Sequence, residues 1–239
     1  MDTIKINKGN TKMIAHRGLS GIEVENTLPA FVAAGNRSYW GIETDVHKTI
    51  DGHYVVFHDD TTGRLCVDDM TVEKSTFDCL RNLKIVDKEG KKGRIDLRIP
   101  TLAEYIRVCK TYDKKAVLEL KNEFTCEEIF EIAAIIEEEG YFENTVFISF
   151  CIANLLYLRS KYPSAWAQFL VDDYSDSLIE ILHTNSLELD IKWSSLTEEN
   201  LATLHSEGIV VNCWACDDVQ YAENLAKWGI EYISSNILE

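Results

Sequence analysis

Short segments rich in apolar, β-branched residues alternate with longer amphipathic segments along most of the chain. Such alternation is typical of a parallel sheet whose strands are covered by helices. Eight short segments are predicted to be strands, namely residues 13–16, 42–46, 116–120, 145–150, 166–170, 187–191, 209–214 and 231–234. The longer segments between them are predicted to be helices.

Residues at the ends of the helical segments support this assignment. The spacing of a capping box occurs at Thr101–Glu104 and at Thr125–Glu128, and Thr197 and Asp217 are predicted as further N-caps. Four glycines follow a helical segment shortly before a strand, where a left-handed turn is expected: Gly35, Gly140, Gly208 and Gly229. The repeated order of helix, glycine and strand favours a barrel or an open wound sheet.

Eight strands favour the barrel, so we predict an α/β fold of the (β/α)8 TIM type, with an open sheet as the alternative. A single barrel domain is expected over residues 1–239. Residues 47–100 break the rhythm with a turn, a short extra strand and an irregular stretch, which predicts a rim insertion after the second strand. The last helix is expected to be truncated, so that barrel closure relies on the N-terminal segment or on another subunit.

Composition and charge narrow the function. No apolar run approaches the roughly 18 residues of a membrane helix, and no secretory signal precedes the first strand, so we expect a cytoplasmic protein. The net charge of −16 argues against nucleic acid as a partner and against a polybasic membrane attachment. A small anion needs only a local positive centre, such as a bound cation. The seven cysteines lack the spacing of a disulfide framework and are expected to be reduced.

Acidic residues near the predicted strand ends are candidate metal ligands. Glu43 and Asp45 are two residues apart, so that the pleat directs both carboxylates to one face, and Glu119 lies on the face of the next main strand that also carries Lys121. Carboxylate oxygens in this arrangement suit Mg²⁺ or Ca²⁺, with Mn²⁺ as a further candidate. The alternative is a set of rim acids paired with basic side chains.

Two histidines also end strand segments. His16 closes MIAH, and His58 closes YVVFH beside an acidic pair. Catalytic side chains of α/β barrels collect at the C-terminal ends of the strands, although a lone histidine there is more often structural. Hydrolysis of a phosphodiester needs a base, an acid and positive charge, which two histidines and one cation supply. Trp214 ends the seventh strand segment, where its ring is expected to stack on a substrate or to pack at the rim.

The remaining histidines, His47, His53, His183 and His205, lack this setting, and His205 is expected on the surface of a helix. Cys213 and Cys216 have the spacing of a redox motif. No second pair completes a zinc site, so both are interpreted as ordinary thiols.

Together these segments resemble the glycerophosphodiester phosphodiesterases. The motifs that carry the resemblance, in order, are HRG at 16–18, ENT at 25–27, ETD at 43–45, DGHYVVFHDD at 51–60, IPTLAEY at 99–105 and LELK at 118–121. Weaker similarity continues through residues 148–150, 196–214 and 228–236. The resemblance implies a barrel enzyme that releases glycerol 3-phosphate and an alcohol with the help of one divalent cation.

Position by position, the resemblance implies roles for seven residues. His16 and His58 match the acid/base pair, Glu43, Asp45 and Glu119 match the metal ligands, and Arg17 and Lys121 match residues that hold the phosphate. The analogy with related barrel phospholipases implies that the substrate's own glycerol hydroxyl attacks phosphorus first and gives a cyclic phosphate that water then opens. The sequence does not decide this. Ser234, Ser235 and Asn236 replace the family's usual Thr-Asp segment, which removes a rim carboxylate.

Three other functions compete with this prediction. A lysophospholipase D-like or phospholipase-like barrel enzyme shares the two-histidine, one-metal scheme but needs an apolar landing surface. A catalytically silent binding module is disfavoured because both histidines and all three carboxylates are present. A retaining glycosidase leaves the histidines unexplained. The sequence leaves the preferred alcohol, the ion and the oligomeric state open, a homodimer included.

Overall fold

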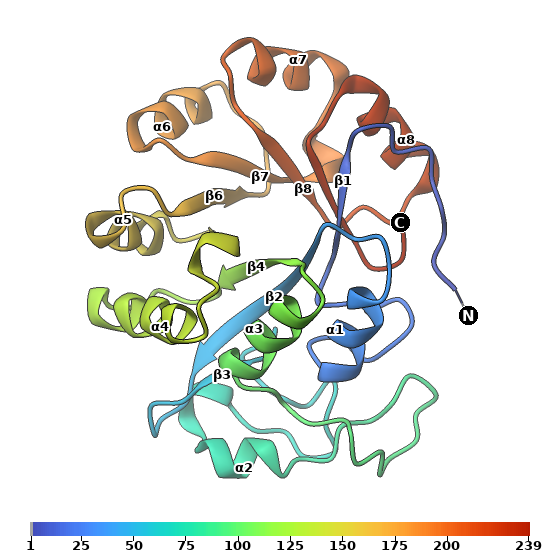
Figure 1. The fold of residues 1–239 in the computed structure, drawn as a ribbon, viewed down its shortest axis with the longest axis vertical. Helices are drawn as coiled ribbons and strands as arrows, with labels where there is room; N and C mark the ends of the chain where they lie inside the picture. Colours follow the sequence, from blue (N-terminus) through green and yellow to red (C-terminus); the bar gives the residue numbers. More distant parts are fainter. Residues whose placement is uncertain (1) are drawn as a thin grey trace.

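A computed structural model describes residues 2–239, and in it eight parallel strands close into a barrel (Figure 1). The barrel strands are β1 (Lys12–Ala15), β2 (Gly41–Lys48), β4 (Lys115–Leu120), β5 (Thr145–Ser149), β6 (Trp166–Val171), β7 (Glu188–Lys192), β8 (Val211–Trp214) and β9 (Tyr232–Ser235). Neighbouring strands pair in this order, and β1 pairs with both β2 and β9. The predicted TIM-type barrel is confirmed, and the open sheet is wrong.

Helices surround the barrel and connect its successive strands (Figure 1). They are α1 (Leu28–Gly35), α3 (Leu102–Thr111), α4 (Cys126–Glu138), α5 (Ile152–Lys161), α6 (Ser177–Asn185), α7 (Glu198–Ser206) and α8 (Val219–Trp228), with short 3-10 helices η2 (Phe142–Asn144) and η3 (Trp193–Ser195). Their apolar stripes, such as Ile129, Ile132 and Ile136 of α4, are buried against the outer barrel face. This burial is the main force that holds the helices on the strands.

The helix caps are mostly those predicted. Capping boxes form at Thr101 and Thr125, and Thr197 forms a third with Asn200. The N-cap predicted at Asp217 is wrong, because Asp218 caps α8. The carboxylate of Asp217 instead accepts hydrogen bonds from the segment after β9.

The glycine prediction holds at three of its four positions. Gly140, Gly208 and Gly229 have positive φ, as a left-handed turn requires. Gly35 does not, because it is the last residue of α1 and Asn36 follows as the cap. A Cβ at Gly35 would lie 2.5 Å from the ring of Tyr112. Glycine is therefore required there because α1 packs closely against the end of α3.

The rim insertion after the second strand is present. It contains β3 (Tyr54–Val56), antiparallel to β2, then η1 (Val72–Lys74), α2 (Phe77–Arg81) and an irregular stretch that leads to α3. The insertion has an apolar core of its own, formed by Val24, Val55, Phe57, Cys66, Val72, Leu80, Ile85, Leu97 and Ile99. Figure 1 shows it against one side of the barrel, beside β2 and α1.

No helix follows β9 among residues 2–239. Residues near the two ends pair instead, with a parallel bridge between Ile4 and Leu238. This pairing agrees with the expectation that the N-terminal segment supports closure. Among the described residues, no helix is long and apolar enough to span a lipid bilayer.

Candidate active site

The chain turns sharply after β1, and two predicted site residues, His16 and Arg17, lie in this turn. His16 follows the strand, and Arg17 and Gly18 both adopt positive φ, +56° and +74°. A Cβ at Gly18 would lie 2.8 Å from Ala30, so only glycine fits beneath α1. The turn directs the backbone N–H of Arg17 to Glu43 Oε2 at 2.7 Å. A non-glycine residue held in this conformation is typical of a functional loop.

Three carboxylates gather on β2 and β4. Glu43, Asp45 and Glu119 are 3%, 0% and 8% exposed, and the strand register sets Asp45 directly opposite Glu119. One ligand atom from each of the three lies within 4.8 Å of the others. Lys121 Nζ lies 3.1 Å from Glu119 Oε1 and 3.7 Å from Asp45 Oδ1.

The pKa values of the three carboxyl groups in this cluster are shifted in different directions. Burial and the charges of Asp45 and Glu119 raise the pKa of Glu43 well above its usual value. Burial and Asp45 likewise raise the pKa of Glu119 to about 8, against the opposing effect of Lys121. Burial acts in the same direction on Asp45, but His58, Arg17 and Lys121 hold the pKa of that carboxyl below its usual value. Arg17 and Lys121 therefore compensate only part of the negative charge of the cluster.

A divalent cation fits this cluster. Asp45 Oδ1 is buried and has no hydrogen-bond partner among the described residues, although buried polar atoms nearly always have one. Carboxylate oxygens are the ligands that Mg²⁺, Ca²⁺ and Mn²⁺ prefer. Glu43, Asp45 and Glu119 would hold such an ion, and its charge would relieve the repulsion that raises the pKa of Glu43.

The hydrogen bonds around His16 define its tautomer. Asn236 Nδ2 donates to Asp217 Oδ2 at 2.6 Å, which directs the amide oxygen of Asn236 toward His16. That oxygen lies 2.9 Å from His16 Nδ1 and also accepts from Ser20 Oγ at 2.6 Å. Nδ1 therefore carries the proton and Nε2 is free to accept one. Burial and the charge of Arg17 lower the pKa of His16 to about 4, while the bond to Asn236 opposes them.

His58 has a different environment. Its Nδ1 donates to Asp59 Oδ1 at 2.6 Å, so this imidazole has a carboxylate partner where His16 has an amide. Lys121 Nζ lies 3.1 Å from Nε2, which accepts because an ammonium group can only donate. Burial lowers the pKa of His58, and the charge of Asp45 opposes that shift.

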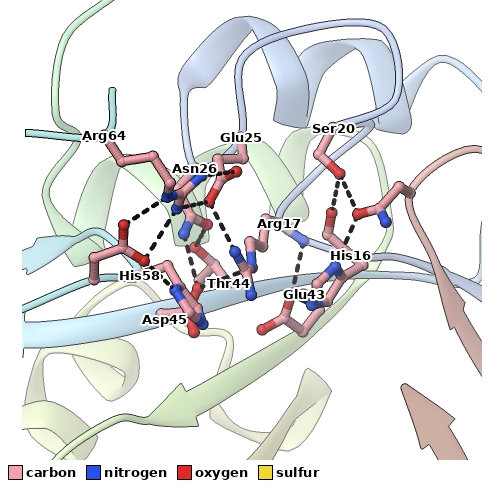
Figure 2. A network of polar contacts seen from close by, with 12 residues as sticks. His16, Arg17, Ser20, Glu25, Asn26, Glu43, Thr44, Asp45, His58 and Arg64 are labelled. Atoms are coloured by element: carbon pink, nitrogen blue, oxygen red, sulfur yellow. Dashed lines mark hydrogen bonds and ion pairs between the residues drawn. The ribbon is translucent and has the colours of Figure 1, made fainter. Parts of the chain in front are cut away.

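A network of polar contacts joins these groups, as Figure 2 shows. Asn26 Nδ2 donates to Asp45 Oδ2 at 2.8 Å and so orients that carboxylate. Glu25 accepts from Arg17 Nη1 at 2.9 Å. Arg64, from the rim insertion, donates to both oxygens of Glu25 and to both oxygens of Asp59. One guanidinium thus connects the partner of Arg17 with the partner of His58 (Figure 2).

These groups surround one cavity at the C-terminal ends of the barrel strands. The cavity has a volume of about 50 Å³ and is lined by His16, Arg17, Glu43, His58, Glu119, Lys121, Ile148, Phe150, Leu170, Asp190, Trp214 and Ser234. Asp45 lies beside Glu119 and completes the carboxylate cluster. The structure therefore brings together all eight site residues named from the sequence. Trp214 packs edge-on against Phe150, with ring centroids 5.5 Å apart, and forms an apolar wall.

Several residues of the network were not named from the sequence as site residues. Glu25 and Asn26 belong to the ENT motif, whose position in the resemblance was the available signal. Asp59 follows His58 directly, and Asn236 belongs to the segment that departs from the family's pattern. Arg64 gave no signal of its own. His47 lies outside the cavity, but its buried ring contacts the carbonyl of His58 and the carboxylate of Glu73, each at 3.3 Å, and so supports the segment after β3.

Comparison with known proteins gives the relatives of this chain. A curated glycerophosphodiester phosphodiesterase from Caldanaerobacter subterraneus is 29% identical over 93% of this chain and 93% of its own. Two solved structures share the fold at 24% identity. One, an Oleispira antarctica phosphodiesterase in complex with the product sn-glycerol-3-phosphate, has a TM-score of 0.82 and covers 98% of this chain and 96% of its own. The other, a glycerophosphodiester phosphodiesterase from Parabacteroides distasonis, has a TM-score of 0.78 over 95% and 93%.

Fold and site define a (β/α)8-barrel hydrolase in which two imidazoles, two basic groups and a carboxylate cluster meet at the strand ends. The model of the glycerophosphoryl diester phosphodiesterase family matches residues 16–237. The chain belongs to this family, and the resemblance seen in the sequence is confirmed.

Proposed function

We propose that the protein hydrolyses glycerophosphodiesters to glycerol 3-phosphate and an alcohol, with a divalent cation, Mg²⁺ or Ca²⁺ and alternatively Mn²⁺, at Glu43, Asp45 and Glu119. The observation that carries this proposal is the convergence of His16 and His58 on one cavity beside that carboxylate cluster. A cation bound there would supply positive charge that neutralises phosphoryl oxygens in the transition state. The sn-glycerol-3-phosphate product in the Oleispira antarctica complex is consistent with this reaction.

The two histidines have different partners, from which we assign different roles. His16 has a neutral amide partner and a free Nε2, so it accepts the proton of the attacking hydroxyl group. His58 has the carboxylate of Asp59 as partner, and a carboxylate stabilises the imidazolium form. We therefore assign His58 to protonate the alkoxide oxygen that departs when the bond between phosphorus and the alcohol breaks. This role requires that Lys121 Nζ leave His58 Nε2 for the phosphate when substrate binds, so that Nε2 can carry the proton.

The basic residues and Trp214 have binding roles in this scheme. Arg17 and Lys121 contact the phosphate, since both line the cavity next to the histidines. Arg17 is held by Glu25 at 2.9 Å, and so its guanidinium needs no reorganisation when an anion arrives. Trp214 stacks on the carbon skeleton of the substrate.

The first experiment follows coupled release of glycerol 3-phosphate from a panel of glycerophosphodiesters, with and without chelator and with added Mg²⁺, Ca²⁺ or Mn²⁺. We expect turnover that chelation abolishes and a divalent ion restores. His16→Ala and His58→Ala should each lose most of it, about 100-fold or more, whereas His183→Ala, at an exposed histidine of α6, should not. A lyso-lipid in the same panel tests the phospholipase alternative. Absence of turnover with every ion and every substrate would refute the proposal.

A second experiment separates the two histidine roles. A glycerol phosphodiester with p-nitrophenol as its alcohol has a leaving group that needs no general acid. His58→Ala should therefore recover much of its loss on this substrate, and His16→Ala should recover none. The opposite pattern would exchange the two assignments, and equal losses on both substrates would remove them.

A further inference from the structure

Three polar side chains from neighbouring strands meet in the barrel interior. Gln168 on β6, Asp190 on β7 and Asn212 on β8 are each 2% exposed or less. Asn212 Nδ2 donates to Gln168 Oε1 at 3.1 Å and to Asp190 Oδ2 at 3.0 Å. None of the three was given a catalytic, metal-binding or substrate-binding role above, yet Asp190 lines the same cavity.

Three buried polar atoms in this region have no hydrogen-bond partner among the described residues, namely Asp190 Oδ1, Asn212 Oδ1 and Trp214 Nε1. Of these residues, Asp190 and Trp214 line the cavity. An unpartnered buried polar atom costs about 1–3 kcal/mol of stability. When such atoms line an active-site cavity, the missing partners are expected on a ligand.

The strand register places these two residues close together. Asp190 pairs with Asn212, and Lys192 pairs with Trp214. Trp214 is two residues beyond Asn212 on the same strand, so both side chains lie on the inner face, at successive levels of the barrel. Asp190 and Trp214 thus form one side of the cavity, and Arg17, His58 and Lys121 form the basic side.

The chemistry of the pair suits a hydroxyl group. Asp190 Oδ2 accepts a hydrogen bond from Asn212 Nδ2, whereas Asp190 Oδ1 has no partner among the described residues and can accept one. The indole N–H of Trp214 only donates. An anion would gain little from a site whose neighbour is Glu119, whereas an alcohol oxygen accepts one bond and donates another.

We propose that Asp190 and Trp214 bind the terminal hydroxyl of the substrate's glycerol moiety and thereby select glycerol over deoxygenated groups. This inference rests on the proposed function. Glycerol phosphate is the part that all glycerophosphodiesters share, so the enclosed inner side of the cavity receives it while the variable alcohol extends to solvent. The terminal hydroxyl is the one farthest from the phosphate, and it reaches the side of the cavity opposite Arg17 and Lys121.

The test compares glycerophosphocholine with an analogue in which the terminal hydroxyl is replaced by hydrogen, the corresponding choline phosphodiester of propane-1,2-diol. The analogue keeps the 2-hydroxyl, so the comparison holds whether that group or water attacks phosphorus. Wild-type protein should prefer glycerophosphocholine by about 10- to 100-fold in kcat/KM, as one or two good hydrogen bonds would give. Calorimetric binding of glycerol 3-phosphate against its terminal-deoxy analogue should show the same preference without turnover.

Two variants test the residues separately. Trp214→Phe keeps an aromatic wall but removes the N–H, and Asp190→Leu removes the carboxyl at similar volume. Each should lower kcat/KM for glycerophosphocholine by more than it lowers kcat/KM for the analogue, so that selectivity approaches one. Asp190→Asn retains one acceptor oxygen and should lose less selectivity than Asp190→Leu. Trp166→Phe is the matched control, since Trp166 Nε1 bonds Glu188 at the other end of the barrel.

Each outcome decides the inference. Equal losses on both substrates would show a structural role for Asp190 and Trp214 and overturn it, as would a wild-type protein that hydrolyses both substrates equally well. If Asp190→Leu does not fold, Trp214→Phe and the binding data still decide. Failure of wild-type protein to hydrolyse either substrate would instead refute the proposed function.

Discussion

At the scale of single residues, Asn236 explains how a departure from the family pattern keeps the site intact. The resemblance predicted loss of a rim carboxylate at this position. In the structure the carboxylate of Asp217, which follows β8, accepts a hydrogen bond from the Asn236 amide at 2.6 Å. The amide then presents its oxygen to His16 Nδ1. Asn236 and Asp217 act as a unit that orients the imidazole.

This pairing predicts that Asn236→Asp is destabilising. The new carboxylate would face Asp217 at hydrogen-bond distance, and two like charges so close should cost about 1–3 kcal/mol of unfolding free energy and lower kcat. Adding Asp217→Asn restores an amide–carboxylate pair in reversed order. Denaturant unfolding and turnover of the single and double variants measure the coupling. If the double variant recovers neither property, the two residues do not act together.

Glu43 gives a prediction in which stability and metal binding change in opposite directions. Its pKa is raised well above the usual value by burial and by Asp45 and Glu119, so Glu43→Gln should leave the metal-free protein as stable as wild type or more so. The same change removes a carboxylate ligand and should weaken Mg²⁺ or Mn²⁺ binding about 10-fold or more.

Thermal unfolding with and without the ion measures both effects. A ligand of the native state stabilises it by RT ln(1 + [L]/Kd), so weaker binding gives a smaller rise in Tm. Glu188→Gln, at a carboxylate of the same barrel that lies outside the cluster, is the control. An undiminished rise in Tm on adding the ion to Glu43→Gln would exclude Glu43 as a ligand.

At the scale of elements, the rim insertion contributes Arg64 to the active site. Its guanidinium binds Glu25 and Asp59 at 2.6–3.1 Å, and these carboxylates hold Arg17 and His58 (Figure 2). Arg64→Ala should therefore lower kcat about 10-fold while changing stability by less than about 1 kcal/mol, because Arg64 is 45% exposed. Arg64→Lys should recover little, since one ammonium group cannot span both carboxylates.

The control for Arg64 is Arg94, in the same insertion. Arg94 also bridges two carboxylates, those of Glu23 and Asp96, and is 36% exposed, but neither partner touches a histidine or Arg17. Steady-state kinetics of Arg94→Ala should match wild type. Equal effects of the two substitutions on kcat would mean that Arg64 only stabilises the insertion.

How far the sequence predicts this molecule depends on whether a feature is local. Strands, capping boxes and three of the four glycine turns follow from nearby residues, and each strand end was located within about two residues. Glu43 and Asp45 were placed on one face by the pleat alone. In contrast, Arg64 meets Glu25 across 39 residues and Asn236 meets His16 across 220. No spacing rule specifies such contacts, because the rim insertion and the barrel closure create them.

At the scale of the whole molecule, the two ends of the described chain meet at one place. The backbone of Glu239 exchanges hydrogen bonds with Ile4 and Ile6, and its side chain accepts from Thr3 Oγ1, Lys5 Nζ and Ser38. In addition to the pairing of β1 with β9, these bonds join the segment before β1 to the segment after β9. The Glu239 carboxylate connects the first residues, the segment after α1 and the segment after β9.

This contact predicts how stability depends on pH. Although burial opposes it, hydrogen bonds from Lys5, Ser38 and Thr3 lower the pKa of Glu239 to about 2 from an ordinary value of 4.5. A group with a depressed folded pKa stabilises the protein above its unfolded pKa, and that contribution is lost as pH falls toward the folded pKa. Glu239→Gln should therefore lower the unfolding free energy by about 2 kcal/mol at pH 7. The difference from wild type should shrink below pH 4.5 and vanish near pH 2, as denaturant unfolding across this range would measure. The control is Glu138→Gln, at an exposed carboxylate of α4, which should show no such pH-dependent difference. If the loss of unfolding free energy in Glu239→Gln stays constant down to about pH 3, the charge of Glu239 contributes nothing to the closure.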